Sequence, residues 1–392
     1  MLKDRITLLL IFLFPIAGNS VRSWTGALFV LIFLWALYCR PWRDFHLENF
    51  EKTLLFTLLV LFLIMILSSL VNGWNYLQTK GLGTQIRILA IIPIYLLIRQ
   101  NIYLLRWFIG GVAVAGVVLG ITCIEEVFLE GGFRAYGVYE SPGLIAGQGA
   151  VFSILLAYRL LSKDCGKLEF YILGLGLAFS VAAILLSGSR STYFSLIVFL
   201  LLAIPLLFKS RSWIGRYLSF IVACFGLIFY LVPTVNQQVK SGYAETKSYF
   251  ELTDPISYNS HGSVGSRLEL WRASIVVSKE NFLVGVGWRN FPAMAASFAS
   301  QGKINIVATQ HPHPHNTYLE FLVSYGVLGL CTLVFFLLLS FKHGNTLMRT
   351  VVLFYAINGI HEGGLFIYGN SISFFLIVWA LLLASSLRRS AL

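Results

Sequence analysis

Three histidines stand at alternate positions in the stretch TQHPHPHNTYLEF, residues 309–321, directly before a long apolar run. They are His311, His313 and His315, and prolines separate them. A proline restricts the residue before it to extended conformations, and Pro314 suits the first turn of a helix beginning with His315. A neutral imidazole with a pKa of about 6.5 accepts protons near neutral pH, so at least one ring is a candidate general base.

Two other interpretations of this cluster stay open. Alternate residues of an extended segment share a side and could ligate a metal, but no cysteine or carboxylate adjoins the histidines before Glu320. The rings could also be interfacial polar residues that cap a helix. We expect a base and no metal, with His315 as first choice, and with His313 as second choice or as the group that orients His315.

Basic side chains gather in the same part of the predicted topology. Arg190 lies in SGSRS, between two apolar runs that leave almost no room for a loop, and a charge at that depth is costly without a partner or a polar cavity. Arg267 precedes a predicted apolar helix face. Guanidinium groups bind phosphate oxygens bidentately, so we expect these two to hold an anion. Lys80, Arg87 and Arg134 are weaker candidates for substrate binding, since exposed cations are usually just solvated.

The composition predicts the elements that must position these residues. The chain has 392 residues, 57% of them hydrophobic and only 12% charged, with a mean hydropathy of +0.79. That leaves too little polar surface for a water-soluble globule, and the continuous apolar runs suit helices rather than barrel strands. We predict an all-α polytopic membrane protein with about twelve transmembrane helices, at 6–20, 24–39, 53–71, 86–98, 107–124, 143–158, 170–187, 192–208, 217–233, 315–339, 350–360 and 371–387.

The distribution of lysine and arginine predicts the orientation. With both termini cytoplasmic, most basic residues fall in the cytoplasmic connections, as the positive-inside rule requires. The net charge of +12 is then explained by topology and does not indicate a nucleic-acid partner. The first span lacks a small-residue cleavage site, so we expect it to be retained.

One integral membrane domain is expected, in three parts: transmembrane helices 1–9 in residues 1–232, a large periplasmic loop in 233–314, and transmembrane helices 10–12 in 315–392. The first part of the loop is polar without a sustained period, so we expect it to be irregular. From Ser266 to Phe282 the spacing of Leu268, Trp271 and Ile275 predicts an amphipathic helix. The Gly-Val-Gly at 285–287 permits a tight turn or close backbone approach.

Taken in order, these motifs resemble those of the O-antigen ligase and polymerase superfamily, over about residues 80–330. The resemblance depends on the following matches: Arg134 to Gly137, Ser187-Gly188-Ser189-Arg190-Ser191, Arg267 to Trp271, Gly285-Val286-Gly287-Trp288, and His313-Pro314-His315-Asn316-Thr317-Tyr318-Leu319. The chain departs from the pattern at Ser141-Pro142-Gly143-Leu144, where relatives often have Pro-Asn, which leaves the role of Arg134 open.

The single large loop and short length most resemble the lipopolysaccharide O-antigen ligases. The resemblance implies a GT-C-like enzyme of the bacterial inner membrane whose active site faces the periplasm. Such an enzyme transfers a polysaccharide from undecaprenyl diphosphate to a hydroxyl of the lipid A core oligosaccharide, without a cofactor. O-antigen polymerases and protein O-oligosaccharyltransferases of the same superfamily remain alternatives, as does a transporter of an anionic lipid, although no internal repeat favours transport.

In the expected mechanism, Arg190 and Arg267 bind the diphosphate of the donor and neutralise the charge that grows as the sugar–phosphate bond breaks. His315 takes the proton of the acceptor hydroxyl while that oxygen attacks the anomeric carbon. A single displacement of this kind inverts the anomeric centre and needs no metal ion.

Overall fold

The computed structural model describes residues 2–207 apart from positions 22, 45, 102 and 139, then 226, 230, 233–251, 262–363 and 368–387. Every regular element in these ranges is helical. The elements are α1 (Leu2–Ser20), α2 (Trp24–Cys39), η1 (Pro41–Asp44), α3 (Asn49–Val71), α4 (Tyr76–Gln85), α5 (Arg87–Arg99), α6 (Leu104–Ile124), η2 (Glu125–Leu129), α7 (Pro142–Leu160), α8 (Lys167–Ser187), α9 (Arg190–Leu207), α11 (Pro233–Phe250), α12 (Ser263–Glu280), α13 (Phe291–Ser300), η3 (Ile306–Gln310), α14 (Thr317–His343), α15 (Thr346–His361) and α16 (Gly369–Leu387).

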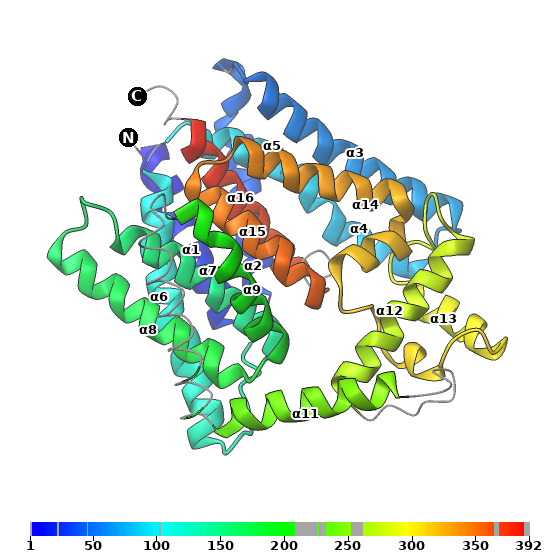
Figure 1. The fold of residues 1–392 in the computed structure, drawn as a ribbon. Coiled ribbons are helices and arrows are strands. Elements are labelled where there is room, and N and C mark those ends of the chain that lie inside the picture. Colours follow the sequence, from blue (N-terminus) through cyan, green and yellow to red (C-terminus); the bar gives the residue numbers. More distant parts are fainter. Residues whose placement is uncertain are drawn as a thin grey trace.

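The helices form a bundle with α11, α12 and α13 gathered at one end (Figure 1). The start of α1 and the end of α16 lie together, away from α11 (Figure 1). We call the end that carries α11–α13 the loop end and the opposite end the terminal end.

Seven helices in the described ranges are long and apolar enough to cross a membrane. They begin at Asn49, Tyr76, Leu104, Pro142, Lys167, Thr317 and Gly369. The protein is therefore a polytopic helical membrane protein, as its composition predicts. The span expected at 6–20 coincides with α1, those at 24–39, 192–208 and 350–360 coincide with the helices α2, α9 and α15, and that at 217–233 lies almost entirely outside the described residues. The span expected at 86–98 begins earlier, at Tyr76, because α4 continues into α5.

Small residues let the central helices approach closely. Gly116 and Gly120 of α6 are four residues apart and face α8. A Cβ at Gly116 would meet the Oγ of Ser180 at 2.5 Å, and one at Gly120 would meet Phe179 at 2.6 Å. From the other side, Gly176 of α8 presses on the backbone of Ala113. Close backbone packing of this kind drives helix association in lipid, where burial of apolar surface gives little advantage.

The helix α14 is broken at Gly326, which has φ 67° and ψ −169°. The backbone of the Gly-Val-Gly turn fills the break: the N–H of Val286 donates to the carbonyl of Val323 at 2.8 Å, and that of Gly287 donates to Ser324 at 2.9 Å. Gly285 and Gly287 have φ of 68° and 88°. The expected tight turn with close backbone approach is thus confirmed. Irregular backbone inside a membrane protein requires this sort of internal pairing.

The helix α3 completes the pairing around this break. The Oγ of Ser68 donates to the carbonyl of Ser324 at 2.8 Å, and the side-chain amide of Asn72 donates to the carbonyl of Gly285 at 2.9 Å. From α4, the amide of Gln78 donates to the carbonyl of Trp288 at 3.0 Å. Side chains from neighbouring helices therefore bond one carbonyl beside the break in α14 and two carbonyls of the turn that packs against it.

Two expectations for the loop need correction. Residues 233–250, expected to be irregular, form the helix α11. The amphipathic helix expected from Ser266 is confirmed as α12, but its buried face differs: Leu270, Ala273 and Val277 are enclosed while Ile275 is 48% exposed. The buried face also includes polar residues, so the spacing of large apolar side chains in the sequence does not identify it.

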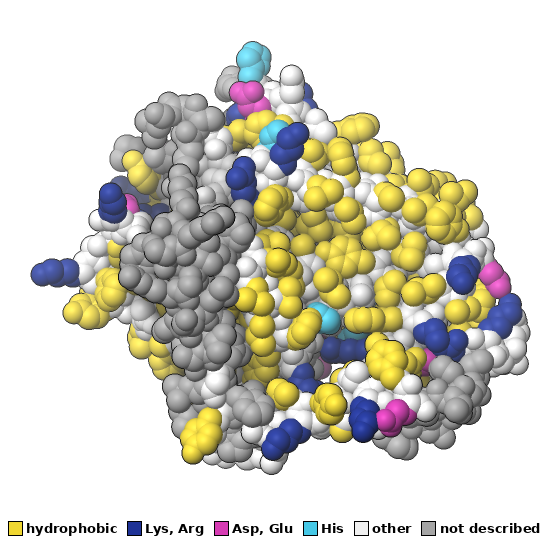
Figure 2. Space-filling model, in the orientation of Figure 1, with side chains coloured by type: hydrophobic (Ala, Val, Ile, Leu, Met, Phe, Trp, Pro, Cys, Tyr) yellow, Lys and Arg dark blue, Asp and Glu magenta, His cyan; other side chains and the backbone are white. Residues whose placement is uncertain are grey.

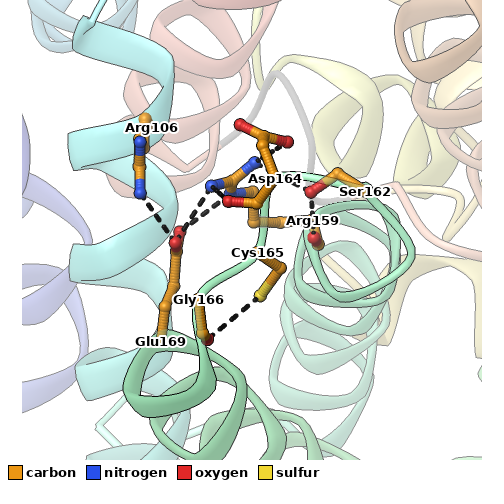
Figure 3. A network of polar contacts seen from close by, with 7 residues as sticks. All are labelled: Arg106, Arg159, Ser162, Asp164, Cys165, Gly166 and Glu169. Carbon is orange, nitrogen blue, oxygen red and sulfur yellow. Dashed lines mark hydrogen bonds and ion pairs between the residues drawn. The ribbon is translucent and has the colours of Figure 1, made fainter.

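An ionic network ties three helices together at the terminal end (Figure 3). Arg159 of α7 donates to both carboxylate oxygens of Glu169 at 2.7 and 2.9 Å, and to Asp164 at 2.8 Å. Arg106 of α6 donates to the same Glu169 at 2.7 Å. The Arg159 side chain is only 10% exposed, so the network links the start of α6, the end of α7 and the start of α8.

Candidate active site

The three histidines form a turn immediately before α14. His311 is extended, with φ −114° and ψ 137°, and ends η3. The helix begins at Thr317, because the side-chain oxygen of Asn316 caps it and accepts from the N–H groups of Tyr318 and Leu319 at 2.9 and 3.0 Å. The expected helix start at His315 is therefore wrong by two residues.

His315 has a strained backbone. Its φ of 54° lies in the left-handed region, which costs a non-glycine residue about 1 to 3 kcal/mol and persists only where surrounding contacts enforce it. Its N–H donates to Nδ1 of His313 at 3.3 Å, and the two ring centroids lie 4.3 Å apart. Backbone strain of this kind is concentrated at functional sites, which supports a functional role for His315.

The hydrogen bonds assign a tautomer to His313. Because Nδ1 of His313 accepts a backbone N–H, the proton of the neutral ring is on Nε2, which lies 3.4 Å from the hydroxyl of Tyr368. His313 thus has contacts at both ring nitrogens. In contrast, Nδ1 of His315 is buried and has no hydrogen-bond partner among the residues that the structure describes.

Both rings are held neutral. Burial, followed by the charge of Arg289, lowers the pKa of His313 to about 4. Burial, followed by the charges of His313 and Arg267, lowers the pKa of His315 to about 2. His311 has its pKa lowered by the same causes, burial first and then Arg267. At neutral pH the turn therefore presents uncharged imidazoles to the cations around it.

Arg267 lies on α12 and faces the histidine turn. Burial lowers its pKa, the charge of Arg190 lowers it further, and the carboxylate of Glu362 acts in the opposite direction. A guanidinium nevertheless stays protonated in proteins. Within the described part of the chain Arg267 makes no hydrogen bond or ion pair, so it is a partly desolvated cation without a direct counter-ion there.

Arg190 is the first residue of α9. Only Gly188, with φ 59°, and Ser189 separate α8 from α9, which confirms that no loop fits there. The Arg190 guanidinium donates to Glu245 at 3.1 Å and to the Oγ of Ser241 at 3.0 Å, both on α11. It therefore ties α11 to the bundle and also reaches Arg267 electrostatically.

The three weaker candidates have different environments. Arg134 stacks on Tyr136 at 5.1 Å and lies against Gly188, next to the turn that carries Arg190. Arg87 donates to Ser373 at 3.0 Å and fills a slot beside glycines of α2 and α16, so its contacts hold helices together. Lys80 is exposed on α4.

Three residues missed by the sequence analysis also belong to this site. Glu362 caps the end of α15 and is 8% exposed, and its carboxylate acts to raise the pKa of Arg267. The Arg289 guanidinium stacks on Trp288, and its charge lowers the pKa of His313. Tyr368 contacts His313. Figure 2 shows a recess below the broad hydrophobic band of the surface, with histidine and basic side chains at its edge. An acid directly between two apolar runs was the available signal for Glu362.

Metal ligation needs several donors that converge on one point. In the described ranges, no group of three His, Cys, Asp or Glu side chains is arranged to hold an ion. The arrangement suits another chemistry: clustered guanidinium groups for an anion, and a neutral imidazole with an open nitrogen for a proton.

Comparison with known proteins supports the resemblance. A Haemophilus influenzae protein described as uncharacterised is 23% identical over 302 residues, which cover 74% of this chain and 71% of that protein. Residues 175–340 match the family described as "O-Antigen ligase", and this stretch includes Arg190, Arg267 and the histidine turn. Members of this family are glycosyltransferase-like enzymes that act on lipid-linked glycans. Over residues 175–340 the chain is therefore similar to the O-antigen ligase family, which supports the resemblance drawn from the sequence motifs.

Proposed function

We propose that the protein is an O-antigen ligase that transfers a polysaccharide from undecaprenyl diphosphate to a hydroxyl of the lipid A core, on the periplasmic face of the inner membrane. One observation carries the proposal. Arg267, without a direct counter-ion in the described structure, shares a site with a neutral histidine that has an open ring nitrogen. A bound anion and a proton acceptor are the two requirements of this transfer.

The donor diphosphate is the anion that we assign to Arg267 and Arg190. Burial has removed water from Arg267 already, so the binding of an anion there carries a reduced desolvation cost. Arg190 is held by Glu245 in the absence of donor, and a phosphate oxygen can replace that carboxylate as its acceptor. The two guanidinium groups then stabilise the charge that develops on the leaving diphosphate.

His315 is the proposed base. The acceptor oxygen attacks the anomeric carbon and its proton passes to the ring of His315. The bond between that carbon and the diphosphate oxygen breaks, and its electron pair stays on the diphosphate. A single displacement inverts the anomeric centre. His313 uses Nδ1 to hold the backbone of His315, so we assign it a positioning role.

Binding of the donor activates this base. A pKa of about 2 makes the imidazole of His315 a weak proton acceptor in the empty site. The charge of Arg267 contributes to that low value, and a bound diphosphate cancels it. The pKa of His315 therefore rises when donor is bound, which couples proton transfer to the presence of the leaving group.

The test uses purified protein in detergent, undecaprenyl-diphosphate-linked glycan, lipid A core and EDTA. We expect metal-independent transfer that His315→Ala and Arg267→Ala each reduce by about a hundredfold or more, as expected for removal of a base or a charge clamp. Arg106→Ala, at the terminal end, is the control. Thermal unfolding checks that the variants are folded.

The products distinguish the alternatives. Extension of the donor glycan itself, with no product on the core, would identify a polymerase, and transfer to protein would identify an oligosaccharyltransferase. Movement of intact donor across a bilayer without bond cleavage would identify a transporter. Transfer that both substitutions leave at the parental rate would refute the assigned residues.

A further inference from the structure

A cavity of about 50 Å³ lies beside the histidine turn, between α7, α15 and α16. Its wall includes the glycines at 143, 147 and 359, which leave space that side chains would fill. Polar groups from Gln148, Asn358 and Glu362 face it together with the rings of Tyr355 and Phe374. Glu362 acts on the charge of Arg267, but none of these side chains is assigned above to bind the diphosphate or to take the proton.

Glu362 connects the cavity to the active site. Its carboxylate lies over the first turn of α7, where a Cβ at Gly143 would overlap Oε2. Its backbone carbonyl accepts from the Oγ1 of Thr317 at 2.8 Å, directly after the histidine turn. The next residue, Gly363, lies so close that a Cβ there would be 2.9 Å from Nδ1 of His313.

Asn358 supplies a second polar group. Its Oδ1 is buried and has no hydrogen-bond partner among the described residues. Its Nδ2 lies against Gly147, at 3.3 Å from where a Cβ would be. A buried carbonyl oxygen without a donor is costly, which indicates a ligand or water that supplies one. A water needs about 10 to 15 Å³ of such volume, so the cavity admits hydroxyl-sized groups and not a whole ring.

The donor clamp and the cavity carry charges of opposite sign. The cations Arg190 and Arg267 lie on α9 and α12, whereas the cavity has a buried carboxylate, amide groups and aromatic rings on α7, α15 and α16. A carboxylate repels a diphosphate, so the donor headgroup does not occupy the cavity. A neutral ligand rich in hydroxyl groups suits it, because each hydroxyl donates to a carboxylate or amide oxygen.

We propose that Glu362 and Asn358 form a subsite for hydroxyl groups of the acceptor sugar. The ring lies at the mouth of the cavity, and the hydroxyls next to the attacking one donate to the Glu362 carboxylate and to Oδ1 of Asn358. This inference rests on the proposed function and specifies its acceptor as a neutral pyranoside face with adjacent hydroxyl groups. Glu362 is a binding residue here and does not take the proton.

Steady-state transfer by the full-length protein tests the subsite with Glu362→Gln and Gly147→Ala. The first removes the charged acceptor, and the second adds a methyl group that narrows the cavity against Asn358. We expect Glu362→Gln to raise the KM for lipid A core about tenfold, since a hydrogen bond to a charged group is worth about that factor. Gly147→Ala should raise the same KM by narrowing the cavity and, because it changes no charge near Arg267, should leave the KM for the donor within twofold. Gly174→Ala on α8, where a Cβ meets no atom within 4 Å, is the matched control.

Calorimetric titration of purified lipid A core into donor-free protein separates this inference from the proposed function. Binding that is weaker in both variants than in the parent and Gly174→Ala supports the subsite. Parental transfer with the same acceptor KM in both variants would overturn the subsite alone. A folded parent that neither binds nor glycosylates the core would overturn the proposed function and, with it, this inference.

Discussion

At Gly326 we expect a single added methyl group to lower the stability of the protein strongly. It breaks α14 with φ 67° and ψ −169°, a conformation that only glycine adopts readily. A Cβ at this position would overlap the carbonyl oxygen of Leu283 and lie 2.5 Å from the backbone nitrogen of Val284. Both are backbone atoms, so no side-chain rotation relieves the clash.

The magnitude of Gly326→Ala follows from two contributions. The backbone conformation costs a non-glycine residue about 1 to 3 kcal/mol. Overpacking against backbone adds about 1 to 3 kcal/mol. We therefore expect the free energy of unfolding to fall by about 4 kcal/mol. The hydrogen bonds from Val286 to Val323 and from Gly287 to Ser324 are the contacts that the displaced backbone would lose.

Equilibrium unfolding in mixed detergent micelles, followed by tryptophan fluorescence, measures this change. Gly174→Ala is the control, since its helical position is open and alanine should stabilise it by about 0.5 to 1 kcal/mol. A Gly326→Ala protein within about 1 kcal/mol of the parent would refute the argument that the break in α14 requires glycine.

Three further predictions concern charge. Arg159→Ala should destabilise the protein by about 2 to 3 kcal/mol, because it removes a side chain that is only 10% exposed and that donates two charge-assisted hydrogen bonds to Glu169. Arg106→Ala, whose side chain is 56% exposed, should cost less than about 1 kcal/mol, and equal effects of the two substitutions in denaturant unfolding would contradict the role of burial. The pKa of His313, about 4 when folded against about 6.5 unfolded, makes stability fall as pH decreases below 6.5, by up to about 2 kcal/mol at pH 5. The pKa of His315 is lowered too and gives a similar dependence, so His313→Gln should lose only the contribution of His313 in thermal unfolding, and an unchanged profile would contradict the assignment. Glu245→Gln should remove the carboxylate charge that competes for Arg190 and tighten pyrophosphate binding by about three- to tenfold in calorimetry. Weaker binding would contradict competition between carboxylate and anion.

The membrane helices were predictable because each is a long apolar run, and the Gly-Val-Gly turn because only glycine permits its backbone. The helix α11 was not. Its sequence is largely polar, and the short apolar spacing of Val235, Val239 and Tyr243 was not recognised as a helical period. The helix packs on α12, and its Glu245 accepts from both Arg190 and the N–H of Val264, the latter at 2.8 Å. Long-range contacts of this kind override local preference.

The buried face of α12 was misjudged for a related reason. Glu269 is 1% exposed and is tolerated in the interior because Arg272 donates to both its carboxylate oxygens, at 2.6 and 3.0 Å. The N–H of Asn305 donates to it as well, at 3.2 Å. A buried acid that is satisfied by a neighbour three residues away and by a distant backbone group shifts the enclosed face toward Leu270, which periodicity of apolar residues alone could not indicate.

For the site, residue types and spacing indicated the histidine turn, Arg190 and Arg267 as a group. The strain at His315 and the hydrogen bond that engages His313 could not be predicted, because both depend on how the turn joins α14. Glu362 is separated from Arg267 in the sequence by the helices α13, α14 and α15, and its charge acts on Arg267 only in the folded chain. A local sequence window contains no information about such a pair.

The anchoring of α14 explains why the reactive groups keep their relative positions. Its first segment, from Thr317 to the break at Gly326, has the histidine turn at one end and the backbone pairing with the Gly-Val-Gly turn at the other. Arg289 follows that second turn directly, so the histidines and Arg289 share one rigid unit. Arg267 instead lies on α12, and Arg190 bonds to α11. The proposed base thus directly precedes α14, while the proposed anion clamp combines α9 of the bundle with α12, which itself packs on α14, so the base and the clamp are held at the site by connected helices.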